Sequence, residues 1–413
     1  MLKVLHTADW HIGQTFHEHD RSHEHQQFLL WLVSTVSKNE IDVLLISGDV
    51  FDGSNPTTTS VNLWYKFLAS VTKVMPHLQV IVTAGNHDSA ARLEATNPFF
   101  EFYNINIVGN VQRLPDGNFD YEKLLVPIKD KAGDIKAWCI AVPYLRPGDY
   151  PLVAGAASLY ADGVTALYEE AYRYALKKRQ QGQAIIAMGH LHTLGTKKCG
   201  NDLNERLIMG GIEYVPSSAF NDGLAYTALG HIHKAQKIGD KENIRYCGSP
   251  IPMSFSEIQY KHQIVVFELL EEQAINIQTI EVPVTIALLR VPEEPKIVSE
   301  VLDELLQLPE AGEGIELAPY LEVRVLLEGP EPGLRYKIEN ALKNKQVRFT
   351  RIDVNYPTNT HAEKDLLTFD GLHELQPRDI FSGLYNDRYN CPPPDEMMQL
   401  FNEVLIKVSL NNN

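Results

Sequence analysis

Short apolar runs alternate with amphipathic segments through the first two thirds of the chain. We expect buried strands at five of these runs, residues 4–5, 43–46, 80–82, 184–188 and 225–229. Between them, apolar residues recur every three or four positions, which predicts helices around Phe28, Leu32 and Val36 and across residues 61–75. Alternating strands and helices of this kind predict an α/β fold, with helices packed on the faces of a sheet.

Prolines mark a boundary near residues 283–296. Beyond it the pattern predicts a small α+β domain with strands at 286–291, 320–327 and 347–354 and helices at 297–306 and 334–345. We therefore expect three parts, residues 1–282, 283–360 and 361–413.

The C-terminal part carries an apolar stripe behind three consecutive prolines, Pro392, Pro393 and Pro394. Its members at helical spacing are Met397, Phe401, Val404, Leu405 and Val408. The stripe either packs on its own domain or docks on a partner. Its position at the end of the chain, after a proline break, favours a partner-binding helix.

Composition places the chain among ordinary globular proteins. Of its 413 residues 44% are hydrophobic and 22% are charged, which allows a large core and more than one domain. The four cysteines form no C-x-x-C pair, so neither a zinc ribbon nor a disulfide framework is predicted. We see no signal peptide and no apolar run long enough to cross a bilayer, and we expect a cytoplasmic protein with no membrane contact.

The formal net charge of −16 is unusual for a protein that binds nucleic acid. Either the substrate is not a polyanion, or metals and local basic residues meet the phosphates while a partner supplies most of the electrostatic attraction. Part of the acidity lies far from the motifs described next, at Glu293, Glu294, Glu310, Glu313 and Glu316. The charge therefore does not decide between the two explanations.

Residues that bind metals follow each of the five predicted strands. They occur in the stretches Asp9-Trp10-His11, Gly48-Asp49, Gly85-Asn86-His87-Asp88, Gly189-His190-Leu191-His192 and Gly230-His231-Ile232-His233. In open α/β sheets ligands bind at the carboxyl ends of strands, and nitrogen and oxygen donors suit Mn, Fe or Zn. Any one of these residues alone could be a loop cap or a buried core histidine, but five such strand ends together predict a metal site.

A histidine-rich segment between the first strand and the first helix has no fixed ligand spacing. It contains His17, His19, His23 and His25 among acidic residues, and we expect these side chains to be solvated.

The five motifs, in this order, resemble those of the calcineurin-like metallophosphoesterase superfamily. Within it, residues 5–13 (LHTADWHIG), 47–52 (SGDVFD) and 85–89 (GNHDS) are similar to the SbcD nucleases, the partners of an SMC-like ATPase and relatives of the archaeal and eukaryotic double-strand-break repair nuclease. Weaker similarity in length and element order extends to the C-terminus. The resemblance implies a four-layer α-β-β-α core, a small α+β capping domain that helps to hold DNA, and C-terminal helices.

The resemblance also implies a role for each motif residue around two Mn²⁺ ions. We expect Asp49 to bridge the two ions; the remaining ligands are Asp9, His11 and His233 for one ion and Asn86, His190 and His231 for the other. His87 would protonate the leaving oxygen or stabilise the transition state, and Asp88 and His192 would orient ligating imidazoles. Asp52 stands where archaeal relatives carry histidine, which puts an auxiliary phosphate role in doubt. Arg92 would contact phosphate or form a surface salt bridge.

These expectations describe a Mn-dependent DNA exonuclease and endonuclease subunit that processes DNA ends and hairpins in repair, recombination and replication. It would act with an SbcC-type SMC-like ATPase, bound through the C-terminal helices, as a homodimer within a heterotetramer. The alternative is a stand-alone metallophosphatase or small-nucleotide phosphodiesterase, which would need neither the extra domain nor the terminal helix. A binding scaffold with a dead site is disfavoured because every ligand type is present.

Overall fold

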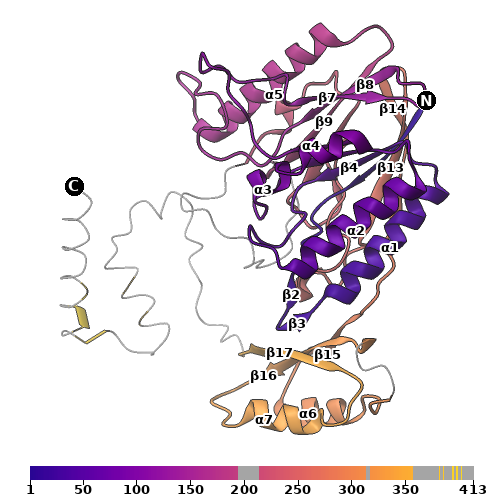
Figure 1. Cartoon of the computed structure of the whole chain (residues 1–413). Coiled ribbons are helices and arrows are strands. Elements are labelled where there is room, and N and C mark those ends of the chain that lie inside the picture. Colours follow the sequence, from indigo (N-terminus) through magenta and orange to yellow (C-terminus); the bar gives the residue numbers. More distant parts are fainter. Residues whose placement is uncertain are drawn as a thin grey trace. The chain divides into compact units, whose positions relative to one another are not determined.

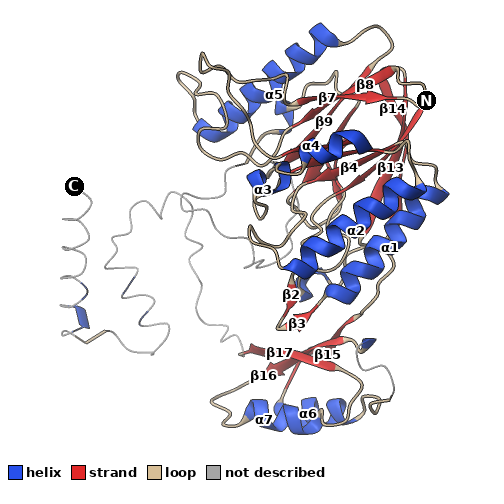
Figure 2. Ribbon diagram, in the orientation of Figure 1, coloured by secondary structure: helices blue, strands red, loops and turns tan. Residues whose placement is uncertain are grey.

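Two six-stranded sheets packed face to face form the main part of the protein (Figures 1 and 2). The computed structural model describes residues 1–193, 214–312 and 317–356, and in the C-terminal part only Phe381, Tyr385, Pro393, Pro394, Met397, Met398 and Phe401. The chain divides into two compact units, Met1–Asn355 and Tyr356–Asn413, and the sheets all belong to the first. Within the described residues no helix is long and apolar enough to cross a membrane.

The first sheet has the strand order β14-β13-β1-β4-β5-β6. Its strands are β1 (Leu2–Thr7), β4 (Val43–Ser47), β5 (Gln79–Thr83), β6 (Ile105–Val108), β13 (Gln263–Leu270) and β14 (Gln273–Glu281). The first four run parallel, and β13 and β14 are antiparallel to their neighbours. On β4, Leu44 and Ile46 pack in the cluster under α1 (Ser22–Lys38) and α2 (Thr58–Val74), whereas Val43 and Leu45 pack between the sheets.

The second sheet has the order β11-β12-β10-β9-β8-β7. Its strands are β7 (Leu125–Lys129), β8 (Ile135–Ala141), β9 (Ala184–His190), β10 (Tyr226–Gly230), β11 (Gln236–Ile238) and β12 (Lys241–Tyr246). The helix α5 (Leu159–Lys178) covers its outer face through Val164, Leu167 and Tyr168 (Figure 1). The two sheets with their helices make four layers in the order α-β-β-α, as the resemblance to the superfamily implies.

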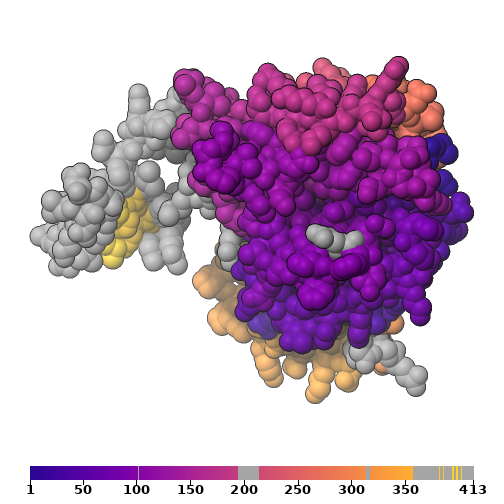
Figure 3. All heavy atoms as spheres, turned by 45° about the horizontal axis from the view of Figure 1, so that its top comes forward, coloured from indigo at the N-terminus to yellow at the C-terminus, as the bar shows by residue number. Residues whose placement is uncertain are grey.

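Short elements connect these layers. They are β2 (Thr15–Phe16), β3 (His19–Asp20), α3 (Ala90–Glu94), α4 (Asn97–Phe100), and the 3₁₀ turns η1 (Glu101–Tyr103), η2 (Ser217–Ala219) and η3 (Phe255–Glu257). In the space-filling view, purple segments from the first half of the chain cover most of the face shown (Figure 3).

A three-stranded domain follows the first sheet. It contains β15 (Leu288–Lys296), β16 (Tyr320–Leu326) and β17 (Arg348–Asn355), with α6 (Val298–Leu306) and α7 (Leu334–Ala341) between them. The order strand, helix, strand, helix, strand is the one that the sequence predicts, and all three strands are parallel. Its own core forms around Val301, Leu321 and Ile338. A separate small apolar cluster, made of Phe16, Phe255, Ile286 and Tyr320, joins it to the main sheets.

The histidine-rich segment differs from the prediction at His25. The helix α1 begins at Ser22 and carries His25 into the interior, where one ring nitrogen lies 3.1 Å from the carbonyl oxygen of Trp10. Burial lowers the pKa of His25 to about 4, so the ring is neutral. The prediction that this histidine is solvated is therefore wrong, because the segment ends inside an amphipathic helix.

The inter-sheet core generates a stability prediction. Leu45 is fully buried between the sheets, so Leu45→Ala removes three buried carbons and leaves a cavity. We expect the free energy of unfolding to fall by about 2–5 kcal/mol, measured by denaturant titration. The control is Leu30→Ala on α1, where the side chain is 56% exposed and a change within about 0.5 kcal/mol is expected. Equal losses in the two variants would contradict this packing.

Candidate metal centre

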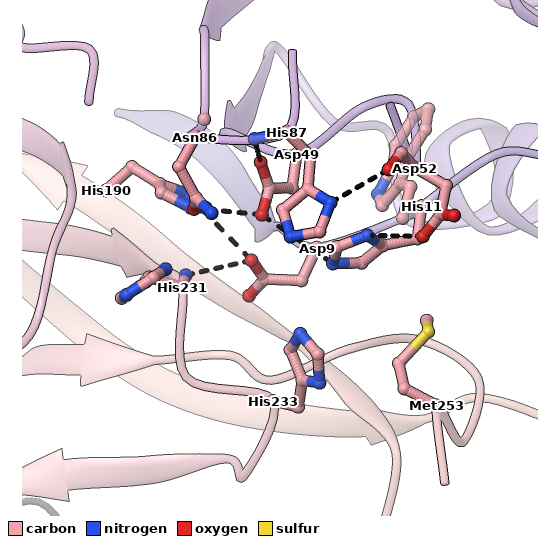
Figure 4. Close-up of polar contacts among 12 residues, drawn as sticks. Asp9, His11, Asp49, Asp52, Asn86, His87, His190, His231, His233 and Met253 are labelled. Atoms are coloured by element: carbon pink, nitrogen blue, oxygen red, sulfur yellow. Dashed lines mark hydrogen bonds and ion pairs between the residues drawn. The ribbon is translucent and has the colours of Figure 1, made fainter. Parts of the chain in front are cut away.

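The carboxyl ends of β1, β4, β5, β9 and β10 meet at one edge of the two sheets. All five sequence motifs follow these strands, and three groups of their side chains lie close enough to share an ion. Figure 4 shows the labelled Asp, Asn and His residues gathered around one space, with Met253 at its edge. The predicted ligand residues therefore come together from both sheets.

Asp49 lies at the centre of this arrangement and is only 2% exposed. Its Oδ2 is 3.2 Å from Nε2 of His190, which comes from the second sheet, and 3.6 Å from Nε2 of His11, which comes from the first. Its Oδ1 accepts the backbone N–H of His87 at 2.9 Å. One carboxylate thus faces imidazoles from both sheets, which is the geometry a bridging ligand needs.

The remaining ligands form groups on the two sides of Asp49. In each of two groups the ligand atoms lie within 4.8 Å of one another: Asp9, His11 and His233; and Asp49, His190 and His231. Asn86 joins the second group, since its Oδ1 is 3.0 Å from Nε2 of His190. A third group of His11, Asp52 and His87 also meets this distance, so geometry alone does not assign His87 to chemistry rather than to binding.

Hydrogen bonds to Nδ1 fix the orientation of several of these rings. His190 donates from Nδ1 to the carbonyl oxygen of Ser47 at 2.9 Å, and His87 donates from Nδ1 to the carbonyl oxygen of Asp52 at 2.8 Å. Nδ1 of His11 lies 3.2 Å from Oδ1 of Asp52. Each contact occupies Nδ1 and leaves Nε2 directed toward the centre, as in many metal-bound histidines.

The same type of contact involves a residue that the sequence does not single out. Nδ1 of His233 lies 3.1 Å from Oε1 of Glu257, a buried carboxylate on η3. Glu257 belongs to no recognised motif, and no pattern around it signals its position. For Asp52 the sequence leaves a phosphate-binding role in doubt, and the structure places its carboxylate beside the ring of His11.

Strained backbone positions cluster at the site. Positive φ angles occur at four of the predicted ligands: Asp9 (54°), His11 (47°), Asp49 (49°) and His231 (98°). Non-glycine residues rarely adopt this region, and such strain persists where the surrounding structure enforces it. Gly85 is needed for a different reason, because a Cβ there would lie 2.1 Å from Oδ1 of Asp49.

The electrostatics of the centre are those of charged groups held out of water. Burial raises the pKa of Asp9, whereas for Asp49 the neighbouring His190 overcomes burial and lowers the pKa. Burial lowers the pKa of His190, but Asp49 raises it to about 9. Burial also lowers the pKa of His233, but the neighbouring Glu257 carboxylate raises it to about 10. Without a cation, these two histidines therefore hold protons beside the carboxylates.

The residues present fit a pair of divalent cations. Within the part of the chain that is described, the buried atoms Asp9 Oδ2 and His11 Nε2 have no hydrogen-bond partner. Unpaired buried polar atoms are costly, and a coordinated cation would satisfy both. The donors are carboxylate and amide oxygens and imidazole nitrogens, and a dication would displace the protons on His190 and His233.

The other predicted site residues take different positions. Asp88 accepts backbone N–H groups of Val50, Phe51 and Gly85, so it holds two loops together rather than an imidazole. The His192 ring packs edge-on against His231 with centroids 4.1 Å apart. Arg92 on α3 is exposed, and no described carboxylate forms an ion pair with it.

Comparison with known proteins agrees with the geometry. The model of the calcineurin-like phosphoesterase family matches residues 2–235, and the model described as the type 5 capsule protein repressor C-terminal domain matches residues 285–389. The curated relatives include the SbcD subunit of the nuclease SbcCD from Rhodobacter capsulatus, 33% identical over 86% of this chain and 88% of that protein. The corresponding proteins from Escherichia coli K12 and Bacillus subtilis are 34% and 28% identical, over 69% and 65% of this chain and 69% and 66% of theirs.

A crystal structure of a dimetal phosphatase from Danio rerio aligns over 68% of this chain and 99% of that one, at a TM-score of 0.37 and 11% identity, too low for further argument. The chain belongs to the calcineurin-like phosphoesterases, and within them to the SbcD family of dinuclear-metal nucleases.

Proposed function

We propose that this chain hydrolyses DNA phosphodiester bonds with two Mn²⁺ ions bridged by Asp49. In this proposal one ion is also held by Asp9, His11 and His233, and the other by Asn86, His190 and His231. The supporting observation is the position of Asp49 Oδ2, which faces His190 on one side and His11 on the other. A single bridging carboxylate between two ligand groups is what a two-metal centre requires.

Two bound cations supply an activated water and neutralise the charge that develops on the phosphoryl group. Asp49 would keep the pair together, and Asp88 would keep the Asp49 and Asn86 loops in place through its three backbone contacts. His87 is half-buried, and its Nδ1 bond to Asp52 leaves Nε2 free to face the leaving oxygen. We assign His87 the role of general acid for that oxygen.

Manganese is the metal that we propose for this donor set. The groups combine imidazole nitrogens with carboxylate oxygens, and neither buried free cysteine, Cys139 or Cys247, belongs to them. Magnesium prefers all-oxygen octahedral sites and gives up its water reluctantly, whereas imidazole suits the later metals.

The proposal includes a partner, because the relatives are named as subunits of the SbcCD nuclease. We propose that an SMC-like ATPase binds the C-terminal helix and that the three-stranded domain helps to hold DNA. In the predicted apolar stripe Met397 and Phe401 are helical, and the amide of Met397 donates to the carbonyl oxygen of Pro394 at 2.9 Å. Val404, Leu405 and Val408 lie outside the described residues.

A homodimer is also part of the proposal. The α4–η1 segment exposes several aromatic side chains, with Phe99, Phe102 and Tyr103 exposed by 73%, 87% and 59%. Exposed apolar clusters of this kind are typical of interaction surfaces. We propose that a second copy of the chain covers this segment.

Activity on defined substrates tests the function. With Mn²⁺, the purified chain should cut linear duplex DNA, and Mg²⁺ at the same concentration should support only slow cleavage. A generic phosphodiester and a mononucleotide phosphate ester serve as comparison substrates. Efficient hydrolysis of the small esters without cleavage of DNA would favour the stand-alone phosphatase or small-nucleotide phosphodiesterase instead.

Substitutions separate metal binding from chemistry. Asp49→Asn should lose both bound Mn²⁺ ions and with them activity, because the bridge loses its charge. His87→Ala should retain two ions per chain and lose about 10²–10⁴-fold in turnover, the usual contribution of a general acid. Metal analysis and single-turnover rates measure the two effects, and His77→Ala, an exposed histidine after α2, is the control. A metal-free His87→Ala protein would show that His87 is a ligand.

Metal affinity should depend on pH. Without metal His190 and His233 hold protons up to pKa values of about 9 and about 10, and both protons must leave when a cation binds. Lowering the pH therefore favours the protonated, metal-free site. We expect the affinity for Mn²⁺ to rise between about pH 6 and pH 8, by up to ~10-fold per pH unit for each proton released. Calorimetry in buffers of different ionisation enthalpy counts these protons, and an affinity independent of pH would contradict the assignment.

A further inference from the structure

Glu257 links a proposed metal ligand to a mostly buried neighbouring segment. Its carboxylate is buried, with Oε1 3.1 Å from Nδ1 of His233. Its Oε2 accepts the backbone N–H of Met253 at 2.9 Å and lies 3.4 Å from the hydroxyl of Ser249. One side of this carboxylate therefore holds the imidazole, and the other side holds residues 249–257, which we call the link segment.

The contact with Glu257 determines how His233 can bind a cation. A carboxylate beside Nδ1 keeps the proton on that nitrogen, so the lone pair of the neutral ring lies on Nε2. His233 belongs to the ligand group with Asp9 and His11, where Asp9 Oδ2 and His11 Nε2 are the buried atoms without partners. The orientation of His233 thus completes this group.

The three-stranded domain contacts the link segment directly. Arg290 on β15 donates from Nη2 to the carbonyl oxygen of Phe255 at 2.8 Å, two residues before Glu257. The same guanidinium donates from Nε to the buried carboxylate of Glu322 on β16 at 2.6 Å. Arg290 is therefore fixed by its own domain and reaches across to the main-chain atoms beside Glu257.

A second contact reaches the same segment through α1. The hydroxyl of Tyr320 on β16 donates to Glu24 at 2.8 Å, and Glu24 forms a buried ion pair with Arg21. Arg21 donates from Nη1 to the carbonyl oxygen of Pro252 at 2.6 Å. The link segment is thus held at Pro252 and at Phe255, on both sides of Met253, whose amide binds Glu257.

We propose that Glu257 is a positioning residue for His233, and that the three-stranded domain sets the affinity of this ion site through the link segment. The inference rests on the proposed function, because it assigns His233 to one of two metal ions. A movement of the three-stranded domain that breaks the Arg290 contact would then release the ion held by Asp9, His11 and His233 before the other ion.

Calorimetric titration of the full-length, chelator-treated protein with Mn²⁺ tests the role of Glu257. Glu257→Ala should lower the affinity for one of the two Mn²⁺ ions by about 10–100-fold, the usual effect of removing the partner of a ligating histidine. The affinity for the other ion should stay within about threefold of the wild-type value. Glu257→Gln is the second variant, since it keeps the shape. A glutamine has one acceptor oxygen, so its NH₂ group must face either the backbone N–H of Met253 or Nδ1–H of His233. One of these two contacts is lost, and the affinity for the same ion should fall. Thermal unfolding without metal checks that both variants are folded.

The contact from the three-stranded domain is tested with a matched pair of arginines. Arg290→Lys keeps a positive charge beside Glu322 but loses the hydrogen bond to the carbonyl oxygen of Phe255. We expect the affinity for the same ion to fall by roughly 3–10-fold, less than when Glu257 itself is removed. Arg324→Lys is the control, because Arg324 on the same sheet pairs with Asp353 and its side chain has a similar exposure of 21% against 27%. It should bind both ions as the wild type does.

The outcomes separate this inference from the proposed function. A wild-type chain that binds fewer than two Mn²⁺ ions would overturn the two-metal centre itself. If the wild type binds two ions and both Glu257 variants bind them equally well, or lose both ions equally, Glu257 does not position His233. If Arg290→Lys behaves like Arg324→Lys, the three-stranded domain does not act through the link segment.

Discussion

Two carboxylates buried among histidines at the meeting edge of two sheets are the constraint on which this structure depends. Asp9 and Asp49 are almost fully excluded from water, and an unpaired charge in such a place is very costly. Backbone N–H groups of His231 and His87 and the ring of His190 compensate part of this charge. At this site the buried atoms Asp9 Oδ2 and His11 Nε2 have no hydrogen-bond partner among the described residues, and a cation between them would satisfy both.

The same constraint explains why the two sheets approach so closely at this edge. Nδ1 of His190, at the end of β9, donates to the carbonyl oxygen of Ser47, at the end of β4 in the other sheet. A Cβ at Gly230 would lie 1.9 Å from that same carbonyl oxygen, and a Cβ at Gly48 would lie 2.1 Å from Nδ1 of His190. The glycines of the motifs are therefore required for the approach of the sheets as much as for the local turns.

The sequence predicts the central strands and the convergence of their polar ends because both depend on local patterns. The runs before Asp9, Asp49, Asn86, His190 and His231 are apolar on both faces, which distinguishes buried parallel strands. The strands β11 and β12 were not predicted, since β11 is a short edge strand and the apolar residues of β12 are few and alternate with polar ones. His25 and Glu257 could not be placed either. His25 contacts Trp10 and Glu257 contacts His233, 15 and 24 residues away, and no spacing rule reports such contacts.

The connection between the three-stranded domain and the main sheets combines a small apolar cluster with hydrogen bonds and a buried ion pair, and this has a consequence for motion. Among the described residues the shared cluster is small, with four buried members and Leu288 packed against them, whereas the domain has a separate core of its own. A small apolar contact resists reorientation weakly, and relative motion is then the default expectation for a domain. The buried ion pair of Arg21 and Glu24, with Tyr320 bound to it, is costly to separate from its partners and favours one orientation. Because that orientation also fixes the peptide groups around Glu257, the geometry of the ion site and the placement of the domain are determined by the same few hydrogen bonds.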